Sequence, residues 1–147
     1  MTPIVYFAAP MRGDTAYKKT VQALVAYIQS IGYSVLTEHV AAEGTPDINL
    51  TAEQIERKDI AWLDTATHVI AEISGASTGV GREIEYARMK GSFGKTPAQI
   101  LCLYNADREF YASPMIRGMD PDRYPNLAVR PYASVNEAQK VIKKFLG

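Results

Sequence analysis

Two acidic residues, Glu83 and Asp59, stand where a carboxylate could do chemistry. Glu83 lies in the first turns of a predicted helix that opens with Ser77-Thr78-Gly79-Val80-Gly81. Asp59 lies on the apolar face of another predicted helix, four residues after Ile55 and three before Trp62. A carboxylate on an apolar face needs a specific partner or a function. Two carboxylates are the minimum for cleaving a glycosidic bond, because one attacks the anomeric carbon and the other manages protons or orients the substrate.

Each carboxylate also has a purely structural interpretation. Glu83 could do no more than complement the dipole at the start of its helix. Asp59 could pair with Arg57, with Lys58 or with a backbone amide. The residues alone leave both interpretations open.

The segment from Ser77 to Gly81 could bind an anion, because the first amides of a helix and a hydroxyl group would face it. A phosphate group would suit such a site. Alternatively, Ser77 or Thr78 only caps the helix, and the glycines ease a tight turn. The third glycine and downstream acid of a dinucleotide fingerprint are absent, as is the Gly-Lys-Ser/Thr of a P-loop, so dinucleotides and triphosphates are disfavoured.

Further polar residues follow other predicted strands. Arg12, Ser77 and Ser113 could hold a phosphate by charge and hydrogen bonds. His39 could line the pocket or contact the phosphate, and a structural imidazole fits it equally well. His68 is predicted at the opposite edge of the sheet, where a structural role is expected.

Metal and nucleophilic serine or cysteine chemistry have little support in the sequence. The two distant histidines and the single cysteine, Cys102, give no zinc-ligand spacing, so no metal and no cofactor is expected. Cys102 lies in an apolar run and is predicted to be a buried small hydrophobe. The G-x-S-x-G signature of a Ser-His-Asp hydrolase does not occur.

Alternating strands and helices must position these residues. Apolar runs predict strands at residues 4–9, 34–40, 66–73, 98–104 and 127–129. Helical spacing and capping boxes predict helices at 17–31, from Thr51 to about Leu63, at 79–89, and after Ser134. Residues 105–125 are predicted to form a long functional loop.

These elements predict the α/β class. Strands that are apolar on both faces favour a parallel five-stranded sheet covered by helices on both faces. We expect one doubly wound, flavodoxin-like or Rossmann-like domain over residues 1–147. Ligands bind at the carboxyl ends of such strands, where the candidate residues fall.

The composition narrows the class of partner. The chain has 147 residues, and its 16 basic residues cancel its 16 acidic ones, so neither nucleic acid nor a membrane surface is an expected partner. Its longest apolar stretches are far shorter than the roughly 20 residues of a membrane span. With no basic leader either, a soluble cytoplasmic protein is expected.

Several blocks of sequence, in order and over most of the chain, resemble a known family. The family is the 2′-deoxynucleoside 5′-monophosphate N-glycosidases (N-hydrolases) of the nucleoside 2-deoxyribosyltransferase superfamily. The blocks are Val5-Tyr6-Phe7, Met11-Arg12-Gly13, Leu36-Thr37-Glu38-His39-Val40-Ala41, Asp59-Ile60-Ala61-Trp62-Leu63, Ala71-Glu72-Ile73, Ser77-Thr78-Gly79-Val80-Gly81-Arg82-Glu83, Ile100-Leu101-Cys102-Leu103 and Ser113-Pro114-Met115-Ile116-Arg117-Gly118.

The resemblance implies a retaining hydrolysis of a deoxynucleoside 5′-monophosphate. Glu83 would attack C1′, the base would leave, and water would release 2-deoxyribose 5-phosphate from a glycosyl ester. Asp59 would be the second carboxylate. Tyr6 would help to position Asp59 or the sugar and would disfavour a 2′-hydroxyl.

The resemblance also implies the binding residues and a homodimer. Arg12, Ser77, Gly79 and Ser113 would match the phosphate-binding positions, and His39 and Met115 would line the pocket. In the family the loop that carries Ser113 and Met115 reaches into the neighbouring subunit's site.

One departure from the family pattern concerns the phosphate site. Pro10 stands two residues before Arg12, where the family has a serine, so a hydroxyl and a backbone donor are missing.

Two alternatives to hydrolysis also remain: a deoxyribosyltransferase that moves the sugar between bases, and a non-catalytic nucleotide sensor, which would not need Glu83.

Overall fold

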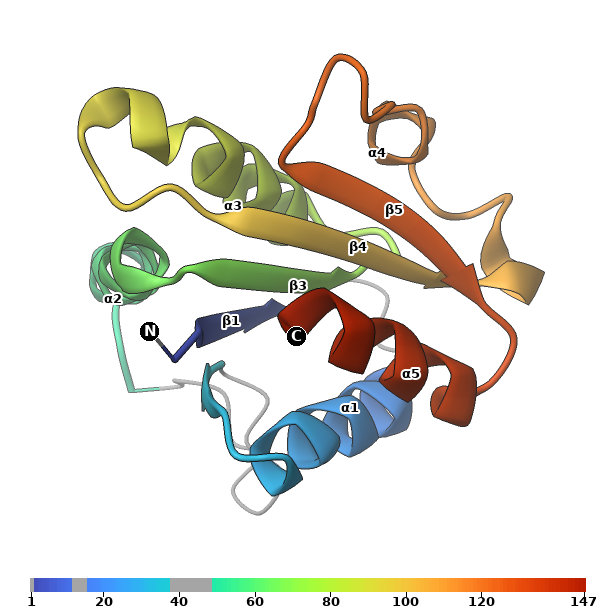
Figure 1. Cartoon of the computed structure of the whole chain (residues 1–147). Coiled ribbons are helices and arrows are strands. Elements are labelled where there is room, and N and C mark those ends of the chain that lie inside the picture. Colours follow the sequence, from blue (N-terminus) through green and yellow to red (C-terminus); the bar gives the residue numbers. More distant parts are fainter. Residues whose placement is uncertain (1, 12–15, 38–48) are drawn as a thin grey trace.

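The computed structural model describes residues 2–11, 16–37 and 49–147, and in this part of the chain five parallel strands form one sheet in the order β2-β1-β3-β4-β5 (Figure 1). The strands are β1 (Ile4–Ala8), β2 (Ser34–Leu36), β3 (His68–Glu72), β4 (Gln99–Asn105) and β5 (Leu127–Tyr132). Neighbouring strands are parallel throughout. The predicted α/β class with a five-stranded parallel sheet is therefore confirmed.

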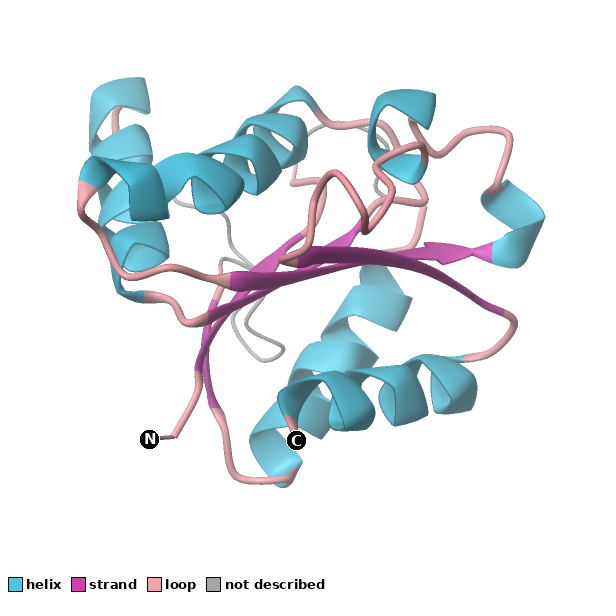
Figure 2. Cartoon of the chain, turned by 45° about the horizontal axis from the view of Figure 1, so that its top comes forward, coloured by secondary structure: helices cyan, strands magenta, loops and turns pink. Residues whose placement is uncertain are grey.

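Helices cover both faces of the sheet (Figure 2). They are α1 (Lys18–Ser30), α2 (Ala52–Thr65), α3 (Thr78–Met89), α4 (Pro114–Arg117) and α5 (Val135–Leu146), with short 3-10 turns η1 (Lys90–Phe93) and η2 (Ala106–Arg108). One face is covered by α1 and α5, and the other by α2 and α3 (Figure 1). None of the helices in the described ranges is both long and apolar enough to cross a membrane.

The strands feed two apolar cores by alternation. Tyr6 and Ala8 of β1 pack with α2 and α3, whereas Val5 and Phe7 pack with α1 and α5. Successive side chains of a strand point to opposite faces, so a strand buried on both sides supplies both cores. Tyr6 thereby lies on the same face of the sheet as α2 and α3.

Polar contacts at the carboxyl end of α2 fix it to α3 and η1. The buried Lys90 ammonium donates to the carbonyl of Ala66 at 2.7 Å, and the Tyr86 hydroxyl donates to Asp64 at 2.6 Å. Burial lowers the pKa of Lys90, and the nearby Asp64 carboxylate opposes that shift. These contacts fix the spacing between the two helices that carry Asp59 and Glu83.

Most element boundaries lie within two residues of the predicted ones, and three segments differ by more. Strand β2 ends at Leu36, and the rest of the predicted span to residue 40 includes residues outside the described ranges. Strand β5 runs on through Arg130 and Pro131 to Tyr132, which an edge strand allows because it need not donate every amide. The predicted loop at 105–125 contains η2 and α4, which the side chains of Asn105 and Ser113 cap.

Candidate active site

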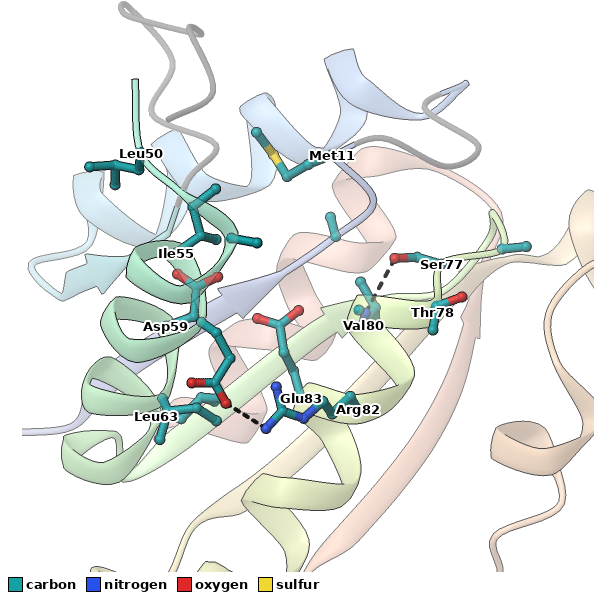
Figure 3. A pocket seen from close by; sticks show the side chains of 16 residues that line it. Met11, Leu50, Ile55, Asp59, Leu63, Ser77, Thr78, Val80, Arg82 and Glu83 are labelled. Carbon is teal, nitrogen blue, oxygen red and sulfur yellow. Dashed lines mark hydrogen bonds and ion pairs between the residues drawn. The ribbon is translucent and has the colours of Figure 1, made fainter. Parts of the chain in front are cut away.

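A cavity of about 860 Å³ lies between α2 and α3, next to the segments that follow β1 and β3 (Figure 3). This volume is in the range of small-molecule sites. The lining residues are Ala9, Met11, Leu50, Ala52, Ile55, Glu56, Asp59, Ile60, Leu63, Ala76, Ser77, Thr78, Gly79, Val80, Arg82 and Glu83. Its position agrees with the rule that parallel sheets bind ligands at the carboxyl ends of their strands.

Glu83 is held at the wall of this cavity by a tyrosine from the central part of the sheet. The hydroxyl of Tyr6 donates a hydrogen bond to Oε2 of Glu83. Tyr6 is almost completely buried, and its ring makes an edge contact with Trp62 of α2, with the centroids 6.5 Å apart. A packed ring thus fixes the orientation of the Glu83 carboxylate. The resemblance had assigned Tyr6 to Asp59 or to the sugar, so the contact with Glu83 is a feature that only the structure shows.

Asp59 faces the same cavity from α2, opposite Glu83 on α3 (Figure 3). Its side chain is 19% exposed and lies 3.9 Å from the Lys58 ammonium. That ammonium also lies over the ring of Trp62, 4.7 Å from the centroid. A contact with Lys58 was one of the structural alternatives for Asp59, and an ion pair of this length contributes little stability. The fold therefore brings the two carboxylates to one cavity.

The start of α3 forms another wall of the cavity. Ser77 is the N-cap residue, and its hydroxyl accepts from the amide of Val80 at 3.2 Å. The first amides of a helix have no acceptor within the helix, and they carry the positive end of its dipole. A Cβ built on Gly79 would meet nothing nearer than the Ser77 hydroxyl at 3.9 Å. Capping and anion binding are thus compatible at this helix start.

Ser113 lies beside the same turn but borders a different cavity. This second cavity, of about 290 Å³, is lined by Ser77, Thr78, Tyr111, Ser113 and Ile116, among others. Met115 is 83% exposed and lines neither cavity in the described part of the chain. Within one chain, therefore, Met115 is not brought to the carboxylates.

Two of the predicted phosphate and pocket residues, Arg12 and His39, lie outside the described ranges. Cys102 and His68, for which the sequence predicted structural roles, both lie where they were expected. Cys102 is fully buried in β4, which raises its pKa to about 12 and makes it a poor nucleophile. His68 opens β3 at the opposite edge of the sheet, where its ring packs on Phe145 and burial lowers its pKa.

An ion pair at the cavity was missed by sequence reasoning. Arg82 donates to Glu56 at 2.6 Å, and both side chains line the cavity and are partly exposed. The pair joins α2 to α3 beside the two carboxylates (Figure 3). The available signal was position, because Glu56 lies one turn before Asp59 and Arg82 directly precedes Glu83.

A second missed feature is a buried carboxylate at the end of β3. Glu72 is 1% exposed and accepts hydrogen bonds from the amide and hydroxyl of Ser74 and from the hydroxyl of Tyr132. Burial raises the pKa of Glu72, while the hydrogen bonds from Tyr132 and Ser74 and the charge of Arg108 oppose the shift. An acidic residue inside an apolar strand was the signal that could have drawn attention to it.

Comparison with known proteins identifies relatives along nearly the whole chain. The family model for nucleoside 2-deoxyribosyltransferase matches residues 5–139. A protein of Thermofilum pendens, named "Putative 2'-deoxynucleoside 5'-phosphate N-hydrolase 1", is 34% identical over 97% of this chain and 94% of its own length. The 5-hydroxymethyl-dUMP N-hydrolase of Tetraodon nigroviridis is 31% identical over 97% of this chain and 96% of its own length.

A solved structure, that of the Clostridium botulinum CMP N-glycosidase, has the same fold. It superposes with a TM-score of 0.66 at 20% identity and covers 96% of this chain and 98% of its own. The family match extends over the strands and helices that build the cavity, including Tyr6, Asp59 and Glu83. This chain belongs to the nucleoside 2-deoxyribosyltransferase family.

Proposed function

We propose that this chain hydrolyses the N-glycosidic bond of 2′-deoxynucleoside 5′-monophosphates, releasing the free base and 2-deoxyribose 5-phosphate. The observation that carries the proposal is the pair of carboxylates in one cavity, with Glu83 oriented by the Tyr6 hydroxyl. The names of the relatives from Thermofilum pendens and Tetraodon nigroviridis support the same reaction and a phosphorylated substrate.

In this proposal the substrate lies along α3. The 5′-phosphate sits at the helix start, where the hydroxyl of Ser77 and the amides near Gly79 can donate to it. The deoxyribose then lies beside Glu83. Apolar side chains of the cavity, among them Met11, Leu50 and Ile55, offer a surface for the base.

The chemistry would proceed by two displacements. A Glu83 oxygen attacks C1′ as the C1′–N bond breaks, and the bonding electrons and then a proton go to the departing base. This step leaves a glycosyl ester on Glu83. Water then attacks C1′, the ester oxygen leaves, and the carboxylate is restored. In this proposal Asp59 would orient the sugar or transfer a proton, and Tyr6 would hold Glu83 for in-line attack.

The active form would be a homodimer in which Ser113 and Met115 reach the neighbouring site. Three large apolar side chains near Ser113 are exposed, Phe110, Tyr111 and Met115, and such a patch is typical of a protein–protein interface. The expected mass in solution is twice the 16.2 kDa of the chain. A monomer at concentrations where the enzyme is fully active would contradict this part of the proposal.

A deoxyribosyltransferase remains the second candidate, because the family model that matches this chain carries that description. The two functions differ in the acceptor that meets the glycosyl ester. Water gives a hydrolase, and a second base gives a transferase. A sensor would bind the nucleotide without any release of base.

A panel of substrates separates these functions. The protein is incubated with each of the four deoxynucleoside monophosphates, the matching ribonucleotides and the unphosphorylated deoxynucleosides, with and without a second base. Release of free base from the deoxynucleoside monophosphates alone is expected. Formation of a new nucleoside would instead support transfer, and binding without turnover would support a sensor.

Gly79→Ala should weaken phosphate binding without weakening the fold. The added Cβ meets no protein atom nearer than 3.9 Å, so it would project into space that the phosphate needs. We expect KM for a deoxynucleoside monophosphate to rise about tenfold or more, while thermal stability stays equal or rises because alanine favours helix. Steady-state kinetics and a melting curve measure both effects.

Gly81→Ala is the matched control. It lies on the same helix, its Cβ would meet nothing within 4 Å, and it does not line the cavity among the described residues. It should leave KM unchanged. Equal KM values for the two variants would count against a phosphate at the start of α3.

Tyr6→Phe should slow the reaction while leaving the ring packing in place. The variant loses only the hydroxyl that donates to Glu83 and keeps the edge contact with Trp62. We expect kcat to fall about 10- to 100-fold with a smaller change in KM. If kcat is unchanged in this variant, the hydroxyl has no part in positioning the nucleophile.

A further inference from the structure

We infer that Glu72 is a positioning residue for the phosphate end of the proposed site, acting through Ser74 on the turn that leads into α3. The inference rests on the proposed function. Glu72 lies on the opposite face of the sheet from the cavity, since the neighbouring Ala71 packs with α2 and α3. It cannot touch the substrate, so any effect must pass through the backbone that follows it.

Ser74 is the residue through which that effect would pass. It is fully buried, and each of its hydrogen-bonding groups has a partner. Its amide donates to Glu72 at 2.5 Å, and its hydroxyl donates to Glu72 at 3.0 Å and accepts from the amide of Asn105 at 2.7 Å. Its carbonyl accepts from Arg108 at 3.3 Å. Ser74 is thus fixed on all sides only three residues before Ser77.

The hydrogen-bond partners of Glu72 and Ser74 come from segments that lie far apart in the sequence. Tyr132, at the end of β5, reaches across β4 to donate to Glu72, and it is itself fully buried in the core under α1 and α5. Asn105 ends β4, and Arg108 belongs to η2. Glu72 and Ser74 together therefore join β3, β4, β5 and the turn at 73–77.

A buried carboxylate with two oxygens is suited to this task because it can accept several donors at once. Oε1 accepts from the Ser74 amide, and Oε2 accepts from the hydroxyls of Ser74 and Tyr132. A glutamine has only one accepting oxygen, so Glu72→Gln leaves at least one of these donors without its present acceptor. The position of the turn, and with it of the helix start, should shift or loosen.

The test measures whether the phosphate is still recognised. Dissociation constants are measured by calorimetry for each deoxynucleoside monophosphate and its unphosphorylated nucleoside, in a Glu83→Gln background that does not consume them. Adding Glu72→Gln should weaken binding of the monophosphates about tenfold and leave that of the nucleosides within about twofold. Tyr132→Phe, which removes one donor and is less disruptive, should give a smaller change in the same direction.

A control separates positioning from general loss of stability. Ile142→Val shortens a side chain in the buried core that also contains Tyr132, and it should destabilise the fold slightly. It should have no effect on phosphate recognition. If Glu72→Gln and Tyr132→Phe behave like Ile142→Val, Glu72 is only structural and the inference is wrong.

The failure of the proposed function would look different. If the Glu83→Gln reference itself binds monophosphates no better than nucleosides, no phosphate site exists at this turn. That result would contradict both the proposed function and the inference. If the reference binds monophosphates more tightly than nucleosides, and the Glu72 and Tyr132 variants do so equally well, only the inference is wrong.

Discussion

Glu83→Gln should lower kcat for a deoxynucleoside monophosphate by about 10³-fold or more while KM or the dissociation constant changes little. Glutamine keeps the size of the side chain and an oxygen that can accept from the Tyr6 hydroxyl. It lacks the negative charge that attacks C1′ and stabilises the oxocarbenium-like transition state. The effect should therefore fall on the chemical step and leave binding largely intact.

A neighbouring glutamate provides the control for this experiment. Glu85 lies on the same helix, is 58% exposed in its ion pair with Arg88, and does not line the cavity in the described part of the chain. Glu85→Gln should turn over substrate at the wild-type rate. Wild-type turnover by Glu83→Gln would remove this residue from the reaction.

Asp59→Asn should lower kcat by about 10²-fold or more, within the range of groups that transfer protons or orient the reacting atoms. The amide cannot take up a proton, and it presents a donor where the carboxylate presented an acceptor. Under the functional interpretation stability should change little, because asparagine has nearly the size of aspartate and the 3.9 Å pair with Lys58 is a weak contribution. Turnover and a melting curve give the two measurements.

The two interpretations of Asp59 predict opposite results. A functional carboxylate gives lost activity at preserved stability, whereas a structural one gives lost stability with activity per folded molecule preserved. Glu53→Gln, an exposed acid on the first turn of the same helix, is the matched control and should be neutral in both measurements.

The strands and helices could be predicted because their signals are local. Apolar runs such as Ile100-Leu101-Cys102-Leu103 indicated strands buried on both faces, and Thr51 with Gln54 indicated the start of α2, where the capping box is present. The carboxyl-end rule then placed Ser77 and Glu83 near one another. The boundaries failed where tertiary position decides, as at Pro131, which only an edge strand accepts.

Contacts between distant segments could not be predicted in the same way. Tyr132 and Glu72 are 60 residues apart, and Arg82 and Glu56 are 26 apart. Neither pair has a periodic signal, since each depends on which strands or helices become neighbours. The hydrogen bond from Tyr6 to Glu83, across 77 residues, belongs to the same class. Such contacts complete the candidate site, and only the folded chain reveals them.

The displacement by Glu83 is tested most directly by the configuration at C1′ of the product. In aqueous methanol, methanol can attack C1′ of the glycosyl ester in place of water, which gives a methyl 2-deoxyriboside 5-phosphate. This product cannot interconvert between anomers, and NMR assigns its configuration. Two successive displacements retain the β configuration of the substrate, so the β-methyl glycoside is expected. The α-methyl glycoside would contradict the mechanism, because it would mean that the acceptor attacks C1′ directly and that Glu83 forms no ester.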